Sequence, residues 1–506
     1  MEYTKNQVIE TYIEDMSDNG EGIGRISGYT LFIKDAVIGD RIKAKITKVK
    51  KKYGYGRVME ILEPSPDRVR PLCDIADKCG GCTLQVMSYE AQLRYKEKKV
   101  RGNLVRIGGF PEDFVEEKLE PIIGAENPFR YRNKAQFPVG YDRKQNIISG
   151  FYISRSHEIV SNCDCYLGVS DNKIITDILL RHFEEHKIEP YDESTGKGLI
   201  RHIMIRKGFV TGEIMVCLII NYEKGRKGIL KRAERETEVF RPVKSGEGSE
   251  INVSPALGTS GSAEGISEIS GEAPYYSREV KQESSRVKFI QAQDELIDKL
   301  IRVEGIKSIC VNINNEMTNV IMGEETYTIW GSDTIRDTLM GLTFEISPAS
   351  FFQVNPVQTE KLYSLISEFA CLSGKEEVWD ICCGIGTITL MLSKKAGKVH
   401  GIEIVPDAIE NAKKNARINN IENADFICAP AEEFLPIIKG KMKADLVVMD
   451  PPRKGMDIKS LDAIIEAKPE RMIYVSCDSA TLARDLKYLY ENGYEPVRIR
   501  PVDMFP

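Results

Sequence analysis

Residues 445–486 read DLVVMDPPRKGMDIKSLDAIIEAKPERMIYVSCDSATLARDL and contain two short apolar runs, each followed at once by polar residues. The runs Leu446–Met449 and Met472–Val475 have the length of strands that are buried on both faces. The segment Ser460–Ala467 between them predicts a helix. A strand, a helix and a second strand in this order indicate an open α/β sheet, which binds its ligands just beyond the carboxyl ends of the strands.

Two groups of chemically capable residues occupy those strand ends. Asp450–Arg453 (DPPR) follows the first strand, and Ser476–Asp478 (SCD) follows the second. The carboxylate of Asp450 can hold a cofactor, and a cysteine such as Cys477 can act as a nucleophile. A buried thiol at a strand end is the alternative for Cys477, but its position between two polar residues and beside DPPR favours catalysis.

The composition indicates a cytoplasmic protein of several domains. A chain of 506 residues is too long for one core, and 42% hydrophobic with 29% charged residues is ordinary for globular domains. No apolar run approaches the ~20 residues of a membrane helix, and the N-terminus lacks the layout of a signal peptide. In a reducing compartment the 12 cysteines predict metal binding or catalysis rather than disulfides. The net charge of −6 requires any nucleic-acid surface to be local.

Residues 1–62 predict a small β-barrel of short alternating runs separated by glycine-rich turns. Between Arg41 and Arg57 the sequence holds eight basic residues and no acidic one, with Tyr53 and Tyr55 among them. Cations suit phosphates and aromatic faces suit unstacked bases, so this pattern favours RNA binding. A lysine-rich edge strand that discourages aggregation is the alternative.

A tight cluster of cysteines follows the barrel. Cys73, Cys79 and Cys82 stand close together among glycines, and three thiolates require a fourth ligand for zinc or for an iron–sulfur cube. Cys163 and Cys165 are the candidates for this fourth ligand. The spacing alone leaves both the metal and the fourth ligand open.

The central part, residues 63–343, predicts an α+β domain. Residues 88–106 indicate a basic helix, and a β-rich region extends from Pro128 to about Tyr222. Four histidines show no metal-ligand spacing with an obvious third partner and are interpreted as structural, namely His157, His182, His186 and His202. Gly, Ser and Glu make up 23 of the 43 residues in 244–286, which predicts a disordered insertion. A helix around Ile290–Arg302 resumes the ordered part.

The sequence VWDICCGIGT, residues 378–387, predicts a strand, a glycine turn and the start of a helix. Gly384 and Gly386 allow a ligand to approach the backbone at the helix N-terminus. Glu403, 17 residues past Gly386 and near the end of the next strand, suits the two hydroxyls of a ribose. The third glycine of the dinucleotide pattern is absent, so these residues together with Asp450 point to S-adenosylmethionine (SAM) rather than NAD.

Four motifs make the chain resemble the RNA (uracil-5-)-methyltransferase family, and most of all its ribosomal-RNA branch. SFFQVNP begins at Ser350, DICCGIGT at Asp380, DPPRKG at Asp450 and SCDSATLARDL at Ser476, in the order typical of the family. The resemblance implies an N-terminal TRAM barrel of the OB type and a C-terminal Rossmann-like SAM-dependent methyltransferase domain over 344–506.

The resemblance also implies a set of site residues. It places a [4Fe-4S] cluster on four cysteines and SAM on residues of the catalytic domain, with Cys477 as the nucleophile. The implied cluster ligands are Cys73, Cys79, Cys82 and Cys165, and the implied SAM-binding residues are Gln353, Cys382, Gly384, Gly386, Glu403 and Asp450. Cys382 stands where the family usually has an aromatic residue, so one wall of the SAM pocket is expected to differ.

The expected reaction is methylation of uracil C5 in 23S ribosomal RNA through a covalent adduct of Cys477 with C6. A tRNA substrate is the alternative within the same family, and a catalytically inactive RNA-binding or assembly factor is the alternative outside it. The family continues beyond the D-M-F-P sequence into a last strand that bears a glutamate base. Because this sequence ends at Pro506, the C-terminal domain is expected to be truncated and to release methylated product slowly.

Overall fold

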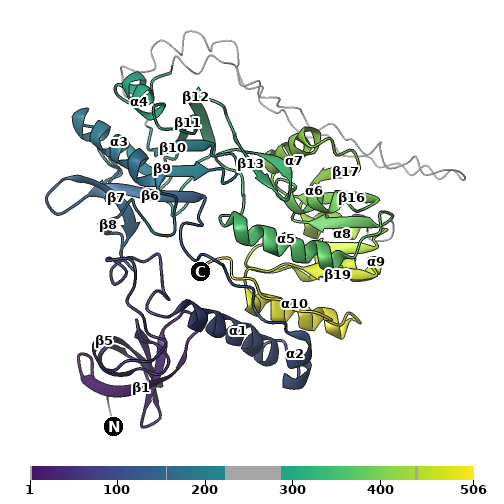
Figure 1. Cartoon of the computed structure of the whole chain (residues 1–506), viewed down its shortest axis with the longest axis horizontal. Helices are drawn as coiled ribbons and strands as arrows, with labels where there is room; N and C mark the ends of the chain where they lie inside the picture. The colour runs from purple at the N-terminus through teal and green to yellow at the C-terminus, as the bar shows by residue number, and fades with distance from the viewer. Residues whose placement is uncertain (1–2, 155, 223–286, 439–442) are drawn as a thin grey trace, which may run out of the picture.

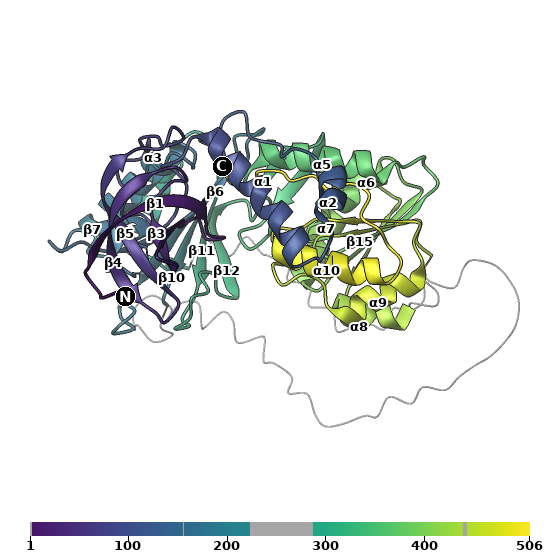
Figure 2. The same cartoon turned by 90° about the horizontal axis from the view of Figure 1, so that it is seen from below.

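A computed structural model describes residues 3–154, 156–222, 287–438 and 443–506. Figure 1 shows an N-terminal barrel, a central sheet and a C-terminal α/β domain, and Figure 2 shows the same three parts from below. The predicted insertion at 244–286 lies outside the described residues. No helix among the described residues is long and apolar enough to cross a membrane.

The predicted N-terminal barrel is confirmed. Its strands close in the order β1-β2-β3-β5-β4. They are β1 (Val8–Met16), β2 (Gly22–Ile26), β3 (Tyr29–Lys34), β4 (Arg41–Val49) and β5 (Tyr53–Glu63). Alternate residues such as Ile13, Leu31 and Ile42 are fully buried inside it, as the period of two in the sequence requires.

The central part is built on a seven-stranded sheet with the order β12-β11-β10-β9-β6-β7-β8. These strands are β6 (Lys134–Tyr141), β7 (Ile147–Tyr152), β8 (Ile159–Ser161), β9 (Ile200–Lys207), β10 (Ile214–Ile220), β11 (Ile306–Ile313) and β12 (Glu325–Gly331). The region was predicted as β-rich, but it also contains the helix α3 (Asp171–Glu185), whose apolar side contacts β7. The helix predicted around Ile290–Arg302 is α4 (Gln293–Leu300).

The C-terminal domain has a five-stranded, fully parallel sheet with the order β17-β16-β15-β18-β19. The strands are β15 (Glu377–Ile381), β16 (Lys398–Glu403), β17 (Ala424–Cys428), β18 (Leu446–Met449) and β19 (Arg471–Tyr474). The apolar runs that predicted β18 and β19 are therefore adjacent strands. The methyltransferase fold predicted for this part is confirmed.

Helices cover both faces of this sheet, and successive residues of β18 explain how (Figure 1). Val448 packs with α5 (Pro356–Ala370), α6 (Thr387–Ser393) and α7 (Pro406–Ile418), whereas Val447 packs with α8 (Ala431–Ile438), α9 (Ile458–Ala467) and α10 (Ser479–Glu491). Both valines are fully buried, as expected for a central parallel strand. The hairpin of β13 (Ile335–Leu339) and β14 (Leu342–Ile346) joins the first of these two cores.

The segment after the barrel connects all three parts. Its helix α1 (Tyr89–Arg106), with the short α2 (Glu112–Lys118), packs against α10 around the buried Leu104 and Ala483 (Figure 2). The backbone then continues beside the C-terminal segment, where Leu119 pairs with Ile499. The α/β domain is therefore completed by residues from the first quarter of the chain.

Candidate active site

The turn between β15 and α6 is built for close approach of a ligand. Gly384 and Gly386 have positive φ values of 55° and 82°, a conformation that glycine adopts without strain. A Cβ atom on Gly386 would lie 3.0 Å from the ring of Phe426, so this position has no room for a side chain. A Cβ atom on Gly384 would meet no heavy atom within 4 Å, which leaves its backbone open to a ligand.

The carboxylate of Glu403 is fixed at the end of β16 beside that turn. One oxygen accepts a hydrogen bond of 3.1 Å from the backbone N–H of Gly384, and the other accepts one of 3.0 Å from Val405. These two hydrogen bonds orient the carboxylate. Carboxylate oxygens in such a position are suited to accept hydrogen bonds from a ribose.

Two further acids lie close together at this edge of the sheet. Asp380 is fully buried and accepts a bond of 2.6 Å from the hydroxyl of Thr389, and its other oxygen has no partner among the described residues. Burial raises the pKa of Asp380 to about 7. Burial, and then the neighbouring charge of Asp380, raises the pKa of Asp450 to about 7.

The same carboxylates act on the pKa of the Cys382 thiol. Burial raises its pKa to about 12, with further contributions from Glu403, Asp380 and Asp450. The three acids therefore converge around this turn, and a thiol with such a pKa is unreactive at neutral pH. A nearby cation would favour the ionised form of these carboxyl groups, so the predicted residues suit the sulfonium and ammonium groups of SAM.

The loop that carries Gln353 is held from the central sheet. The guanidinium of Arg206, fully buried on β9, donates hydrogen bonds of 3.0 Å to the carbonyl of Ser347 and 2.8 Å to that of Ser350. The side-chain amide of Asn133 donates a bond of 3.0 Å to the carbonyl of Gln353. Phe351 in the same loop is 69% exposed, so its ring is available to a bound base.

The structure places Cys477 one turn beyond β19, where the sequence predicted it, and leaves it exposed. The backbone N–H of Val475 donates a bond of 2.8 Å to the carbonyl of Met449, which keeps the ends of β18 and β19 level. Asp478 caps α10 by accepting a bond of 2.8 Å from the N–H of Ala480. The turn that presents Cys477 is therefore fixed on both sides, and its thiol is not part of a packed core.

Two residues of α10 hold the DPPR loop beside this turn. Asp485 is buried, and its Oδ2 accepts hydrogen bonds of 2.9 Å from the N–H of Met456 and 2.6 Å from the hydroxyl of Tyr474. Arg484 donates a bond of 2.9 Å to the carbonyl of Lys454. The helix that follows the Cys477 turn thus also positions the loop that begins at Asp450.

The four predicted cluster cysteines come from two segments of the chain, one before β6 and one after β8. Burial, and then the charges of Cys165, Cys79 and Cys73, raise the pKa of Cys82 to about 11, so these thiols lie within electrostatic range of one another. Amide donors face the sulfurs, namely the N–H of Gly81 at 3.4 Å from Cys79 Sγ and Gln85 Nε2 at 3.1 Å from Cys82 Sγ. Hydrogen bonds to cysteine sulfurs are typical of iron–sulfur sites, and this set of donors fits the group.

The structure distinguishes the two candidates for the fourth cysteine. The thiol of Cys163 donates a bond of 3.2 Å to the carbonyl of Ser149. Cys165 does act on Cys82, and its carbonyl accepts a bond of 3.1 Å from Arg130. Cys165, the residue that the resemblance implied, is thus an electrostatic neighbour of Cys82 with a polar contact of its own.

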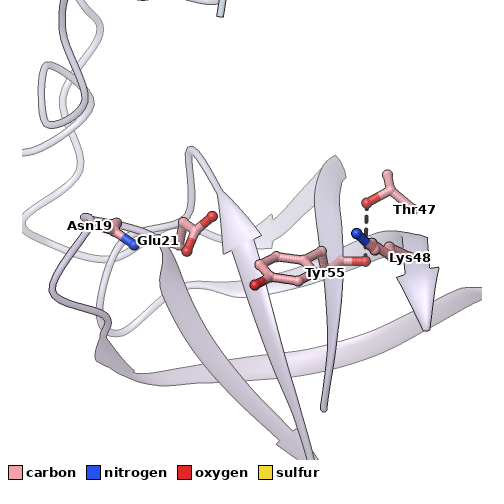
Figure 3. A pocket seen from close by; sticks show the side chains of 5 residues that line it. All are labelled: Asn19, Glu21, Thr47, Lys48 and Tyr55. Carbon is pink, nitrogen blue, oxygen red and sulfur yellow. Dashed lines mark hydrogen bonds between the residues drawn. The ribbon is translucent and has the colours of Figure 1, made fainter. Parts of the chain in front are cut away.

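The barrel carries a hollow of about 290 Å³ on its surface, lined by Asn19, Glu21, Thr47, Lys48 and Tyr55. Figure 3 shows the ring of Tyr55 between the turn with Glu21 and the strand with Lys48, and the bond of 3.1 Å from the hydroxyl of Thr47 to the carbonyl of Tyr55. Arg41 and Lys43 are neutralised by glutamates, with distances of 2.9 Å to Glu63 and 2.8 Å to Glu60. The other basic residues of the predicted run have no ion-pair partner in the described ranges. They are Lys45, Lys48, Lys50, Lys51, Lys52 and Arg57.

Sequence reasoning missed several residues that position the site. Arg206, Asn133 and Asp485 act through other groups from distant parts of the chain, so no local motif identifies the first two. Asp485 belongs to the SCDSATLARDL sequence. An acid on the inner, apolar side of an amphipathic helix is unusual, and this position could have identified Asp485 from the sequence.

Comparison with known proteins finds family matches for the N-terminal barrel and for the C-terminal domain. Residues 329–505 match the model of the tRNA (uracil-5-)-methyltransferase family, and residues 3–59 match that of the TRAM domain. The chain is 41% identical over 504 residues to an uncharacterized RNA methyltransferase of Clostridium tetani, which covers 99% of this chain and 94% of that protein. It is 43% identical over 505 residues to one of Clostridium acetobutylicum, covering 99% of this chain and 95% of the relative.

One solved structure is similar over the whole chain. The tRNA (uracil-54, C5)-methyltransferase of Pyrococcus abyssi, in complex with S-adenosyl-L-homocysteine, superimposes with a TM-score of 0.67 at 24% identity. The match covers 98% of this chain and 97% of that one, so the two share the fold.

Proposed function

The chain belongs to the SAM-dependent RNA uracil-5-methyltransferase family, and on this premise we propose that it methylates C5 of uridine in 23S ribosomal RNA. The proposal rests on the positions of two residues that follow the ends of adjacent strands. The exposed Cys477 and the carboxylate of Asp450 follow adjacent parallel strands and are tied to each other by α10.

The proposed reaction explains why a thiol is needed. Carbon C5 of uracil is a weak nucleophile, so the thiolate of Cys477 first forms a bond to C6, and the electron pair of the C5–C6 double bond moves into an enolate. SAM, when bound, would supply a methyl group from its positively charged sulfur, and the electron pair of the broken S–CH3 bond would stay on that sulfur as a neutral thioether. After C5 has taken this methyl group, loss of the C5 proton to a base restores the double bond and expels Cys477. The adduct divides one difficult step into easier ones.

The chain's own residues place the two reactants. We propose that Glu403 holds the ribose and Asp450 the charged end of SAM, while Gln353, Gly384, Gly386 and the small Cys382 form the remaining walls. Orientation of this kind converts a bimolecular reaction into an effectively unimolecular one. The uridine must leave its stack to reach Cys477, and the exposed ring of Phe351 is available to receive it.

Trapping with a substrate analogue tests the nucleophile. RNA that contains 5-fluorouridine cannot lose a proton from C5, so with SAM it should leave a covalent complex that survives denaturing gel electrophoresis. The variant Cys477→Ala should give none, while Cys428→Ala, which removes another exposed thiol, should trap as much as the unaltered protein. Trapping by Cys477→Ala would refute the proposal. No trapping by any form would favour a binding or assembly factor.

The choice of ribosomal RNA rests on the combination of the TRAM barrel with a cysteine quartet, through the resemblance described above. A tRNA substrate is the second candidate, because both the matched family and the similar solved structure are named for tRNA. Mapping of 5-methyluridine in 23S ribosomal RNA and in tRNA, from cells with and without the gene, separates the two. Loss of the modification from tRNA alone would overturn the ribosomal assignment.

We further propose that Cys73, Cys79, Cys82 and Cys165 hold a [4Fe-4S] cluster that stabilises the fold between the barrel and the central sheet. Protein purified without oxygen should be brown and contain about four iron atoms per chain. Cys165→Ser should lose the colour and most of the iron, whereas Cys163→Ser should keep both. Stoichiometric zinc without colour would contradict the cluster.

A further inference from the structure

A second group of metal-ligating side chains lies outside both sites described above. His182 lies in the last turn of α3, Glu185 is the last residue of that helix, and His186 is the C-cap residue that follows it. Glu295 reaches them from the first turn of α4, which contacts α3 (Figure 1). One ligand atom from each of these four residues lies within 4.8 Å of the ligand atoms of the other three.

His182 has the environment of a metal-binding histidine. Its side chain is fully buried, and Nε2 lies 3.0 Å from the carbonyl of Gln291. A carbonyl can only accept, so Nε2 carries the proton and Nδ1 carries a lone pair. No partner for Nδ1 is found among the described residues, although it is buried. A histidine that donates through one nitrogen to a carbonyl and offers the other is the usual arrangement at metal sites.

The remaining ligands are already close to the required spacing. His186 Nε2 lies 3.2 Å from Glu295 Oε2, and a tetrahedral zinc ion holds its ligand atoms roughly 3.4 Å apart. Lys299 contacts Glu185 at 2.7 Å through Oε2 and Glu295 at 2.9 Å through Oε1. This leaves the second oxygen of each carboxylate for a metal, while Lys299 offsets part of their charge.

We propose that His182, Glu185, His186 and Glu295 form a zinc site that joins α3 to α4. Two imidazoles and two carboxylates suit zinc better than magnesium or calcium, which prefer oxygen ligands alone. Four protein ligands leave no open position, which indicates a structural role rather than a catalytic one. The site is separate from the proposed methyltransferase reaction and does not depend on it.

Zinc titration of the full chain tests the site. Protein purified without oxygen, with its iron content measured, is dialysed against a chelator and titrated with Zn²⁺ in competition with a colorimetric indicator. We expect one equivalent of zinc, and Glu295→Gln and His186→Gln should each weaken binding at least about tenfold. His157→Gln is the control, because His157 forms an exposed 2.8 Å pair with Glu193. No uptake, or uptake unchanged in Glu295→Gln, overturns the site.

Cobalt distinguishes this site from the cysteines. Co²⁺ bound to nitrogen and oxygen should give visible bands without the intense near-ultraviolet band of sulfur ligation. A sulfur band would assign the ion to the cysteines and refute the proposal. Without zinc, the circular dichroism and iron content of both variants should match those of the unaltered protein. Weaker zinc binding by a variant then reports the loss of a ligand and not a loss of folding. Zinc should also raise the midpoint of thermal unfolding in the unaltered protein and not in Glu295→Gln.

Discussion

At the scale of single residues, the proposed SAM pocket holds acids that destabilise the protein when no ligand is bound. Asp380 and Asp450 both have a pKa raised to about 7, chiefly by burial. Binding sites often retain groups that destabilise the free protein, because the ligand later compensates for them. The sequence marked Asp450 through the DPPR motif, but the interaction with Asp380 depends on the pairing of β15 with β18.

Asp450→Asn should stabilise the free protein and weaken the binding of SAM. The pKa of Asp450 is about 7 in the folded state and near 3.8 when unfolded, so between these values the folded protein binds a proton that the unfolded chain has lost. Stability therefore falls as pH rises through this window and stays low above it. We expect the variant to be more stable by about 1–3 kcal/mol at pH 8.5, with the difference shrinking toward pH 5.

Chemical denaturation at several pH values, with SAM binding by calorimetry, measures both effects. Asp407→Asn is the control: it removes an exposed acid in the first turn of α7 and should not stabilise the protein. Parallel stability profiles for Asp450→Asn and the unaltered protein would contradict the assignment.

At the scale of elements, α10 has two functions. Its N-terminus follows Cys477, and its buried Asp485 holds the DPPR loop. The spacing of apolar residues predicted the neighbouring strands correctly because strands buried on both faces leave a continuous apolar run. The same spacing did not predict α3, which lies within a region predicted as β-rich, because the surrounding strands dominate the composition of that region. The histidines of α3 were interpreted as structural because their partner Glu295 lies more than 100 residues away.

Asp485→Asn should slow the chemical step. An asparagine keeps the size, but its amide nitrogen would face the guanidinium of Arg484, which now donates a bond of 2.7 Å to Asp485. The DPPR loop should shift relative to Cys477, and the rate of trapping by 5-fluorouridine RNA should fall roughly ten- to hundredfold. Asp462→Asn is the matched control, because Asp462 also accepts a tyrosine hydroxyl, that of Tyr488 at 2.5 Å, but on an exposed surface. Equal rates for the two variants would exclude a positioning role for Asp485.

At the scale of the whole molecule, buried polar contacts hold the catalytic domain to the segment that follows the barrel. Lys96 on α1 forms a 2.7 Å ion pair with Asp503, whose carboxylate is 3% exposed and also accepts a bond of 2.9 Å from Tyr89. The motifs predicted the barrel and the α/β domain, but α1 was predicted only as a basic helix. Most basic residues of a helix face water, and the charge pattern of α1 does not distinguish Lys96, which faces another domain, from them.

Lys96→Met should destabilise the protein by about 2–3 kcal/mol, because it leaves the buried carboxylate of Asp503 without its cation. Lys98→Met is the matched control on the same helix, since its partner Asp15 is 44% exposed, and it should cost less than about 1 kcal/mol. Denaturant unfolding measures both variants. Equal costs would show that the Lys96 pair contributes no more than a surface pair.

The packing of α1 on α10 also bears on how the enzyme is produced. A fragment that starts near residue 344 would present to water the apolar surface around Ala483, which Leu104 covers in the intact chain. Contacts between residues almost 400 positions apart make folding slow and expose unfinished intermediates to aggregation. Recombinant work on the C-terminal domain should therefore keep α1 and α2. This can be done by expressing the intact polypeptide or by supplying the two helices as a separate peptide that binds to the domain.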